Sequence, residues 1–426
     1  MATRRSIRTP PSCCDLDPSR RRFLRTAGLL TGAGVITSVV GTSFMQAALG
    51  STGSARNVLV VLSLRGGADG LSLVVPHGER AYAKARPTLA IPRGSLLAQD
   101  QMFGLHPKFA PLLPMWTAGT FGAVNAVGLD MPNRSHFAAM EAIEDADAGS
   151  VERRGWLNRL VGLDTQVSAV EAMQIGSPVV PTAMYGESPV LAARSIDDIA
   201  LPDRDNPVQF ERRVGSLREA WSGDETSLGR GARAALDMSD VFAGVAGYPT
   251  EPEHGAVYPV SSLGNALADV ARLVRADIGA EVVTVDFGNW DMHVGVGTVD
   301  GGPMTSAVDE LALSLAAFFG DLGPLGANVT VVTISEFGRR LDENANNGLD
   351  HGWGNVMLLL GAGVVGGRYH GTWPGLGDSK LVQGDLAVTN DYRSVLAEVV
   401  ATRFGADVSK VFPDFQPKRL GVMAAA

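Results

Sequence analysis

The sequence predicts an α/β protein with a doubly wound, mostly parallel sheet and helices on both faces. Short, nearly continuous Val/Ile/Leu runs are the first observation, and such runs are typical of strands buried on both faces of a parallel sheet. They lie at 57–64, 121–127, 281–287, 328–335 and 356–360. Helical patterns between these runs are the second observation, because alternation of strand and helix characterises doubly wound folds.

Apolar residues recur at three- and four-residue steps over 263–278 and 304–322, which predicts two amphipathic helices. The segment from about 195 to 258 is charged and contains Pro, and we expect helices near 208–221 and 228–242 within it. We interpret it as a helical insertion in a single domain that spans 51–426, because strands on either side of it complete one sheet. A separate domain is the alternative.

The charge of the chain is unevenly distributed. The 426 residues contain 36 Lys and Arg against 45 Asp and Glu, which gives a net charge of -9. Residues 1–50 hold seven Arg, two Asp and both cysteines, so this segment carries +5 and the remainder -14. An acidic balance offers no basic surface for the counterion release on which nucleic-acid binding depends, and we expect no nucleic-acid partner.

The N-terminus resembles a twin-arginine export signal. Arg20 and Arg21 precede Phe23 and Leu24, and an uncharged stretch follows from 26 to 50. A retained membrane anchor is the alternative, but several glycines and hydroxyl residues weaken insertion. We expect cleavage near residue 50, passage through the twin-arginine translocase to the periplasm or cell envelope, and a mature chain without a stable membrane span. Such a chain lacks Cys, so any metal must be held by His, Asp or Glu.

Acids and imidazoles cluster next to several predicted strands. Asp69 follows the first run, Asp291 and His293 follow the run 281–287, Glu336 follows the run 328–335, and His351 lies a short loop later. In doubly wound sheets the ligand crevice lies outside the carboxyl ends of the strands. We therefore predict these five residues as ligands of one or two divalent ions, Zn, Mn or Mg.

Ser135 is a candidate nucleophile because it precedes a helical segment, where the helix dipole favours an ionised hydroxyl and an incoming anion. An ordinary helix N-cap is the alternative. Arg134 and Arg339 are candidates for an anion clamp. The sequence Gly361–Gly366 matches GxGxxG, but Arg, Tyr, His and Pro follow where a helix would be required, so we interpret it as a turn.

Several of these segments together resemble the domain of unknown function 1501 family, exported bacterial proteins related to the alkaline phosphatase and sulfatase superfamily. They are LRGGADGLSLVVP, RPTLAIP, FGLHP, NRSHF, GNWDMH, TISEFGRR, DHGWGN and GGRYHGTWPGL. The resemblance implies that Asp69 is the first ligand and Ser135 the nucleophile, with Asp291 and His293 as a middle pair. Glu336 and His351 resemble the later acid and His. Glu336-Phe337 stands where Asp-His is typical, which leaves one metal, a weakened second site or none.

Two functions of different classes follow. The first is an exported metal-dependent hydrolase of phosphate or sulfate esters, whose substrate is a small anionic ester or an envelope glycan. The second is a non-catalytic binding or cell-envelope protein on the same scaffold, because a fold alone does not determine function.

Overall fold

The computed structural model describes residues 55–425, apart from 148–152, 165–169, 200–205 and most of 225–247. The expected export signal at 1–50 lies outside the described residues, and so does most of the helix expected at 228–242. Among the described residues, no helix has the length and apolar character that crossing a membrane requires.

A mixed sheet of nine strands forms the centre of the molecule and confirms the predicted α/β class. Its strand order is β10-β4-β9-β8-β1-β7-β5-β6, and β11 also pairs with β4. The strands are β1 (Val58–Leu64), β4 (Phe121–Gly128), β5 (Ala172–Ile175), β6 (Leu191–Ala193), β7 (Val282–Phe287), β8 (Val329–Ile334), β9 (Asn355–Gly361), β10 (Tyr369–His370) and β11 (Asn390–Asp391). The five predicted runs are β1, β4, β7, β8 and β9.

Strand direction determines which loops meet. The pairs that β1 forms with β7 and β8 are parallel, whereas β9 runs antiparallel to both β4 and β8. Leu62 of β1 is in register with Val285 of β7 and Thr333 of β8. Because β9 is reversed, it begins at the edge where β1, β7 and β8 end.

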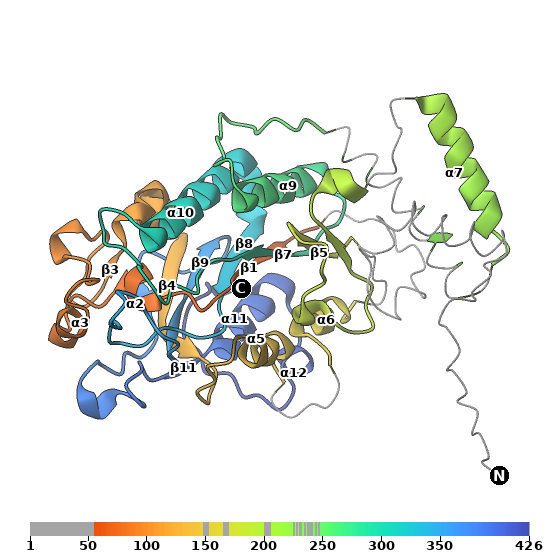
Figure 1. Ribbon diagram of the computed structural model, residues 1–426. Helices are drawn as coiled ribbons and strands as arrows, with labels where there is room; N and C mark the ends of the chain where they lie inside the picture. The colour runs from red at the N-terminus through yellow and green to blue at the C-terminus, as the bar shows by residue number, and fades with distance from the viewer. Residues whose placement is uncertain are drawn as a thin grey trace, which may run out of the picture.

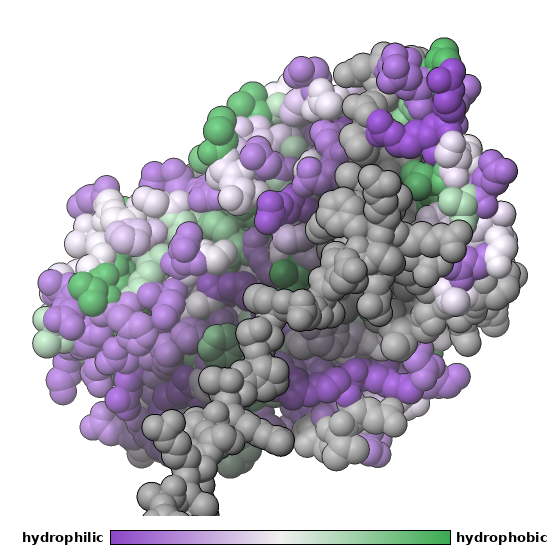
Figure 2. Space-filling view, turned by 45° about the vertical axis from the view of Figure 1, so that its right-hand side comes forward, coloured by the Kyte–Doolittle hydropathy of each residue, from purple (hydrophilic) through white to green (hydrophobic). Residues whose placement is uncertain are grey.

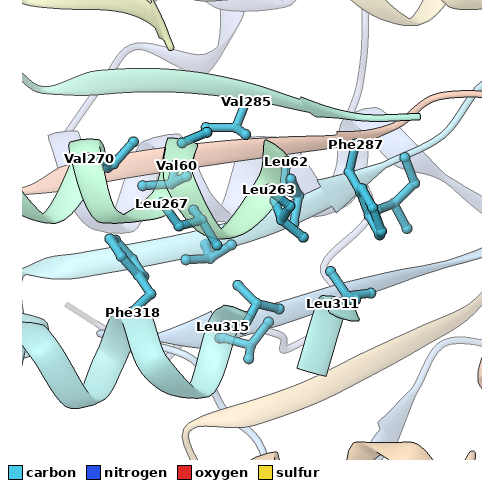
Figure 3. Packing of buried hydrophobic residues seen from close by; sticks show 14 of the residues in the cluster. Val60, Leu62, Leu263, Leu267, Val270, Val285, Phe287, Leu311, Leu315 and Phe318 are labelled. Atoms are coloured by element: carbon cyan, nitrogen blue, oxygen red, sulfur yellow. The ribbon is translucent and has the colours of Figure 1, made fainter. Parts of the chain in front are cut away.

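Helices cover both faces of the sheet (Figure 1). One face carries α9 (Ser262–Ala276) and α10 (Pro303–Leu322), and the other carries α5 (His136–Asp145), α6 (Trp156–Val161), α11 (Tyr392–Phe404) and α12 (Val408–Val411). Strand β1 alternates between the two cores, since Val60 and Leu62 pack in the first and Leu59 and Val61 in the second. Figure 3 shows the first core, in which Leu263, Leu267 and Val270 of α9 and Leu311, Leu315 and Phe318 of α10 lie against the strands.

Smaller elements lie around these layers. Helix α2 (Gly70–Leu73) contacts β2 (Val74–Val75), which pairs with β3 (Gly104–Leu105) in a separate two-stranded sheet. Helix α3 (Arg80–Ala85) lies between these two strands in the chain, and α4 (Leu113–Thr117) contacts β4. Helix α7 (Pro207–Trp221) corresponds to the helix expected near 208–221. It stands apart from the sheet in Figure 1. Its apolar residues pack with Leu236 in a cluster of their own. The surface in Figure 2 is largely hydrophilic, with scattered apolar residues.

His106 precedes the 3-10 helix Pro107–Leu112 and is buried at 1% exposure. Its Nδ1 accepts a hydrogen bond of 3.1 Å from the backbone N–H of Lys108. Burial lowers the pKa of His106 to about 4, and the charge of Lys108 acts in the same direction. The folded protein therefore holds this imidazole neutral.

We expect His106 to make stability depend on pH. Its folded pKa lies below the ordinary value of 6.5, so its contribution is fully present above pH 6.5 and is lost as the pH falls towards 4. Between pH 7 and pH 4.5 this group removes roughly 2–3 kcal/mol of unfolding free energy. Denaturant unfolding of the wild type and of His106→Asn, which keeps an acceptor but does not titrate, measures the difference. Equal pH dependence in both proteins contradicts the expectation.

Candidate metal centre

Five segments meet at one edge of the sheet. Residues 65–67 follow β1, residues 288–293 follow β7, and residues 335–340 follow β8. Residues 350–354 lead into the reversed strand β9, and His136 begins α5. An isolated β-bridge between Arg339 and His351 joins two of these loops. These polar loops meet, as predicted, because β1, β7 and β8 end at this edge and the reversed strand β9 begins there.

Three ligand atoms converge at this edge: Nε2 of His136, Oδ1 of Asp291 and Nε2 of His351 all lie within 4.8 Å of one another. The two imidazole nitrogens are 3.0 Å apart, and Asp291 Oδ1 lies 3.4 Å from His136 Nε2 and 3.2 Å from His351 Nε2. A tetrahedral ion with bonds of about 2.0–2.1 Å separates its ligand atoms by about 3.3 Å. The three separations therefore suit the coordination of one ion.

His293 brings a further nitrogen to the same place. Its Nε2 lies 2.9 Å from His351 Nε2 and 3.0 Å from Asp291 Oδ1. His293 thus lies next to two of the three ligand atoms, while the set that lies within 4.8 Å of one another consists of His136, Asp291 and His351. We call these three residues together with His293 the metal centre.

The opposite nitrogen of each imidazole is held by a protein acceptor. His351 Nδ1 lies 2.8 Å from the carbonyl oxygen of Arg134, which can only accept, so this nitrogen carries the hydrogen. His136 Nδ1 donates to Glu336 Oε1 at 3.1 Å, and His293 Nδ1 donates to Asp350 Oδ1 at 2.8 Å. With hydrogen on each Nδ1, every Nε2 presents a lone pair to the metal centre.

Nitrogen lone pairs and a carboxylate oxygen repel one another at these distances unless a positive charge lies among them. Imidazoles whose Nδ1–H bonds a carboxylate or a carbonyl are the usual arrangement of metal-ligating histidines. The described residues thus fit a divalent ion bound by nitrogen and oxygen, and neutral imidazole suits Zn and Mn better than Mg.

Asp291 is held in its ionised form. Burial acts to raise its pKa, but the hydrogen bond from Arg339 and the positive charge of that guanidinium outweigh burial and lower the pKa to about 2. Arg339 Nη2 donates to Asp291 Oδ1 at 2.7 Å. The ligand therefore carries its negative charge at any pH at which the imidazoles are neutral.

The metal centre is open to solvent on one side. The exposed fractions of the side chains are 28% for His136, 21% for His351 and 47% for Asp291. Phe337 is buried and packs behind two of the rings, with centroids 4.9 Å from His136 and 4.7 Å from His351.

Glu336 lies behind the metal centre and organises the turn after β1. Its two carboxylate oxygens accept hydrogen bonds from the backbone N–H groups of Gly66 and Gly67, at 2.7 and 2.9 Å. Gly66 has φ +113°, and a Cβ there would lie 2.6 Å from the backbone nitrogen of Asp291. Only glycine permits this approach. Glu336 therefore orients His136 and holds the turn against Asp291.

Asp69 lies outside the metal centre, although its position at the end of β1 predicted a ligand. Both of its oxygens bind the Arg86 guanidinium, at 2.5 and 2.9 Å, and both side chains are fully buried. Arg86 also donates to the carbonyl groups of Arg340 and Leu341. The Asp69 carboxylate is thus engaged in an internal ion pair.

The two arginines predicted as an anion clamp bind groups of the protein. Arg339 is buried at 1% exposure, and its guanidinium donates to four carbonyl oxygens in addition to Asp291. Arg134 binds Asp385 and Gln383. Arg339 therefore ties the loops of the site together, whereas Arg134 lies at the rim.

Ser135 occupies the N-cap position of α5, which was the alternative to a nucleophile in the sequence analysis. Its hydroxyl, however, makes no capping hydrogen bond. The side chain is exposed. Its backbone N–H instead binds Asn133 Oδ1 at 3.0 Å. Ser135 lies between Arg134, whose carbonyl orients His351, and the ligand His136.

His136 was not expected among the ligands. It belongs to the same NRSHF segment as Ser135, but an imidazole in the first turn of a helix carries no spacing that marks a ligand. The usable signal was its position, because α5 begins at the edge where the other candidates were expected.

A family model described as a protein of unknown function (DUF1501) matches residues 97–405, which is more than half of the chain. The chain belongs to the DUF1501 family. The matched range contains all four residues of the metal centre together with Glu336 and Asp350, whereas Asp69 lies before it. No curated protein matches this DUF1501 chain in a sequence comparison.

We expect the purified DUF1501 protein to bind about one equivalent of Zn or Mn. His136→Ala and His351→Ala each remove a ligand and should reduce retained metal below about a tenth of an equivalent after dialysis. Asp350→Asn weakens the support of His293 and should lower metal affinity about tenfold. His370→Ala, outside the metal centre, serves as the control. Elemental analysis and metal titration measure these effects, and full retention in His351→Ala would contradict the assignment.

Proposed function

We propose that this DUF1501 protein is a metal-dependent hydrolase of phosphate or sulfate esters, exported by the twin-arginine pathway and distantly related to the alkaline phosphatase and sulfatase superfamily. The observation that supports it most is the open cluster of His136, Asp291 and His351, whose imidazoles are oriented from behind by protein acceptors. We propose one ion rather than two, because Asp69 is engaged by Arg86.

The ion, when bound, lowers the pKa of a nucleophile and neutralises charge that develops on a transferring phosphoryl or sulfuryl group. The chain supplies the rest. Glu336, Asp350 and the Arg134 carbonyl fix the imidazoles before substrate arrives, and Arg339 keeps Asp291 ionised. Preorganisation of this kind avoids a reorganisation cost during the reaction.

Ser135 is the proposed nucleophile. Its hydroxyl is exposed, is not used as a helix cap, and lies directly before the ligand His136. In this reaction Ser135 Oγ forms a bond to phosphorus or sulfur and releases its proton to solvent. The ester bond to the leaving alcohol breaks, the alcohol takes up a proton, and water then hydrolyses the seryl ester.

A non-catalytic binding role on the same scaffold is the second candidate. It is favoured by the internal engagement of Asp69 and Arg339, two residues expected to serve the reaction. In that case the open metal centre would hold a ligand of the cell envelope without turnover.

Hydrolysis of aryl phosphate and aryl sulfate by the metal-loaded protein tests the proposal. We expect Ser135→Ala to lower kcat at least about 100-fold while metal content is unchanged, because the nucleophile is removed and the ligands remain. Ser63→Ala, at a buried site within β1, serves as the matched serine control. Equal turnover in Ser135→Ala would eliminate it as nucleophile, and metal binding with no turnover on either ester would favour the binding role.

A further inference from the structure

Two arginines are held side by side at the rim of the metal centre by one turn, residues 382–385. Asp385 at the end of this turn is fully buried and receives one arginine on each oxygen. Arg134 Nε donates to Oδ2 at 3.2 Å, and Arg340 Nε donates to Oδ1 at 3.3 Å. Gln383 binds both as well, through its side-chain oxygen to Arg134 and its backbone carbonyl to Arg340.

This arrangement leaves positive charge and hydrogen-bond donors directed to solvent. Two guanidinium groups share one carboxylate, and their side chains remain 35% and 42% exposed. Arg340 Nη1 donates to no acceptor among the residues that the structure describes. Asp385 and Gln383 engage all three nitrogens of Arg134 but only Nε and Nη2 of Arg340. Both guanidinium planes are thereby fixed, which is the preparation that a bound anion requires, and Arg340 Nη1 is the donor that the anion would meet first.

The two arginines are linked to the metal centre through the backbone. The Arg134 carbonyl accepts from His351 Nδ1 at 2.8 Å, and the Arg340 N–H donates to the carbonyl of Asp350 at 2.9 Å. Nδ1 and Nε2 lie on opposite sides of an imidazole ring. Arg134 therefore contacts the side of His351 that faces away from the ligand atoms, and the two guanidinium groups lie beside the centre rather than in it.

We propose that Arg134 and Arg340 form a subsite for a second anionic group of the substrate, next to the ester at the metal centre. This inference rests on the proposed function and narrows it. The substrate class is an ester that carries two or more anionic groups, such as a bisphosphate or one repeat of a phosphorylated or sulfated polymer. A simple monoester occupies the metal centre alone.

Anion binding to the metal-free protein tests the subsite separately from catalysis. Inorganic pyrophosphate is titrated calorimetrically into the full chain after chelation of metal, at low ionic strength. We expect Arg340→Gln to weaken binding about tenfold and Arg340→Lys, which keeps the charge, to recover part of the loss. Arg80→Gln, an exposed arginine on α3, is the matched control and should bind as the wild type does. Equal binding by wild type and Arg340→Gln overturns the subsite, whether or not the protein is a hydrolase.

Kinetics on the metal-loaded protein then test the substrate class. We expect Arg340→Gln to raise KM about tenfold for an aryl phosphate that carries a second phosphate, with kcat unchanged. KM for the unsubstituted aryl phosphate should not change. An equal change in KM for both esters contradicts a separate subsite. If Arg340→Gln weakens pyrophosphate binding but the metal-loaded wild type hydrolyses neither ester, the proposed function is rejected and the subsite is retained.

Discussion

The electrostatics of the sheet edge depend on a single constraint, which is that the Nε2 lone pairs of His136 and His351 converge with Oδ1 of Asp291. His293 Nε2 lies next to His351 and Asp291. Each imidazole is prevented from turning its hydrogen inwards, because its Nδ1 already donates to an acceptor behind it. A centre built in this way needs a cation to be stable at short range. The hydrogen bonds at the three Nδ1 atoms therefore create affinity for a positive ion.

The backbone around the centre serves the same constraint. Strand β9 is reversed, so the loop that carries His351 reaches the edge where β1, β7 and β8 end. Arg339 binds the turn after β1, the loop after β7 and the loop before β9, and Glu336 secures Gly66 and Gly67 from the other side. Buried hydrogen bonds and ion pairs of this kind are costly to break, because removal of one partner leaves the other buried, unpaired and out of reach of water. Asp69 and Arg86 extend this internal framework.

The sequence predicted the central strands well, because β1, β4, β7, β8 and β9 are almost continuously apolar. Strands β10 and β11 have two residues each and leave no pattern that periodicity can detect. The metal centre was predicted in part. Asp291, His293 and His351 could be placed from strand ends, whereas Asp69 met a buried arginine that only tertiary contacts bring to it. Prediction of His136 as a ligand would have required knowing where α5 begins relative to the sheet, and no spacing in the sequence shows this.

X-ray absorption spectroscopy on the Zn- or Mn-loaded protein tests the central claim most directly, because it counts the imidazoles bound to the ion. The convergence of His136 and His351 with Asp291, and the position of His293 beside His351, predict one ion with two or three imidazole ligands and oxygen in the remaining positions. In His351→Ala the imidazole signal should fall or the ion should be lost. An ion bound by oxygen alone, or a protein that binds no Zn or Mn at all, would contradict the account.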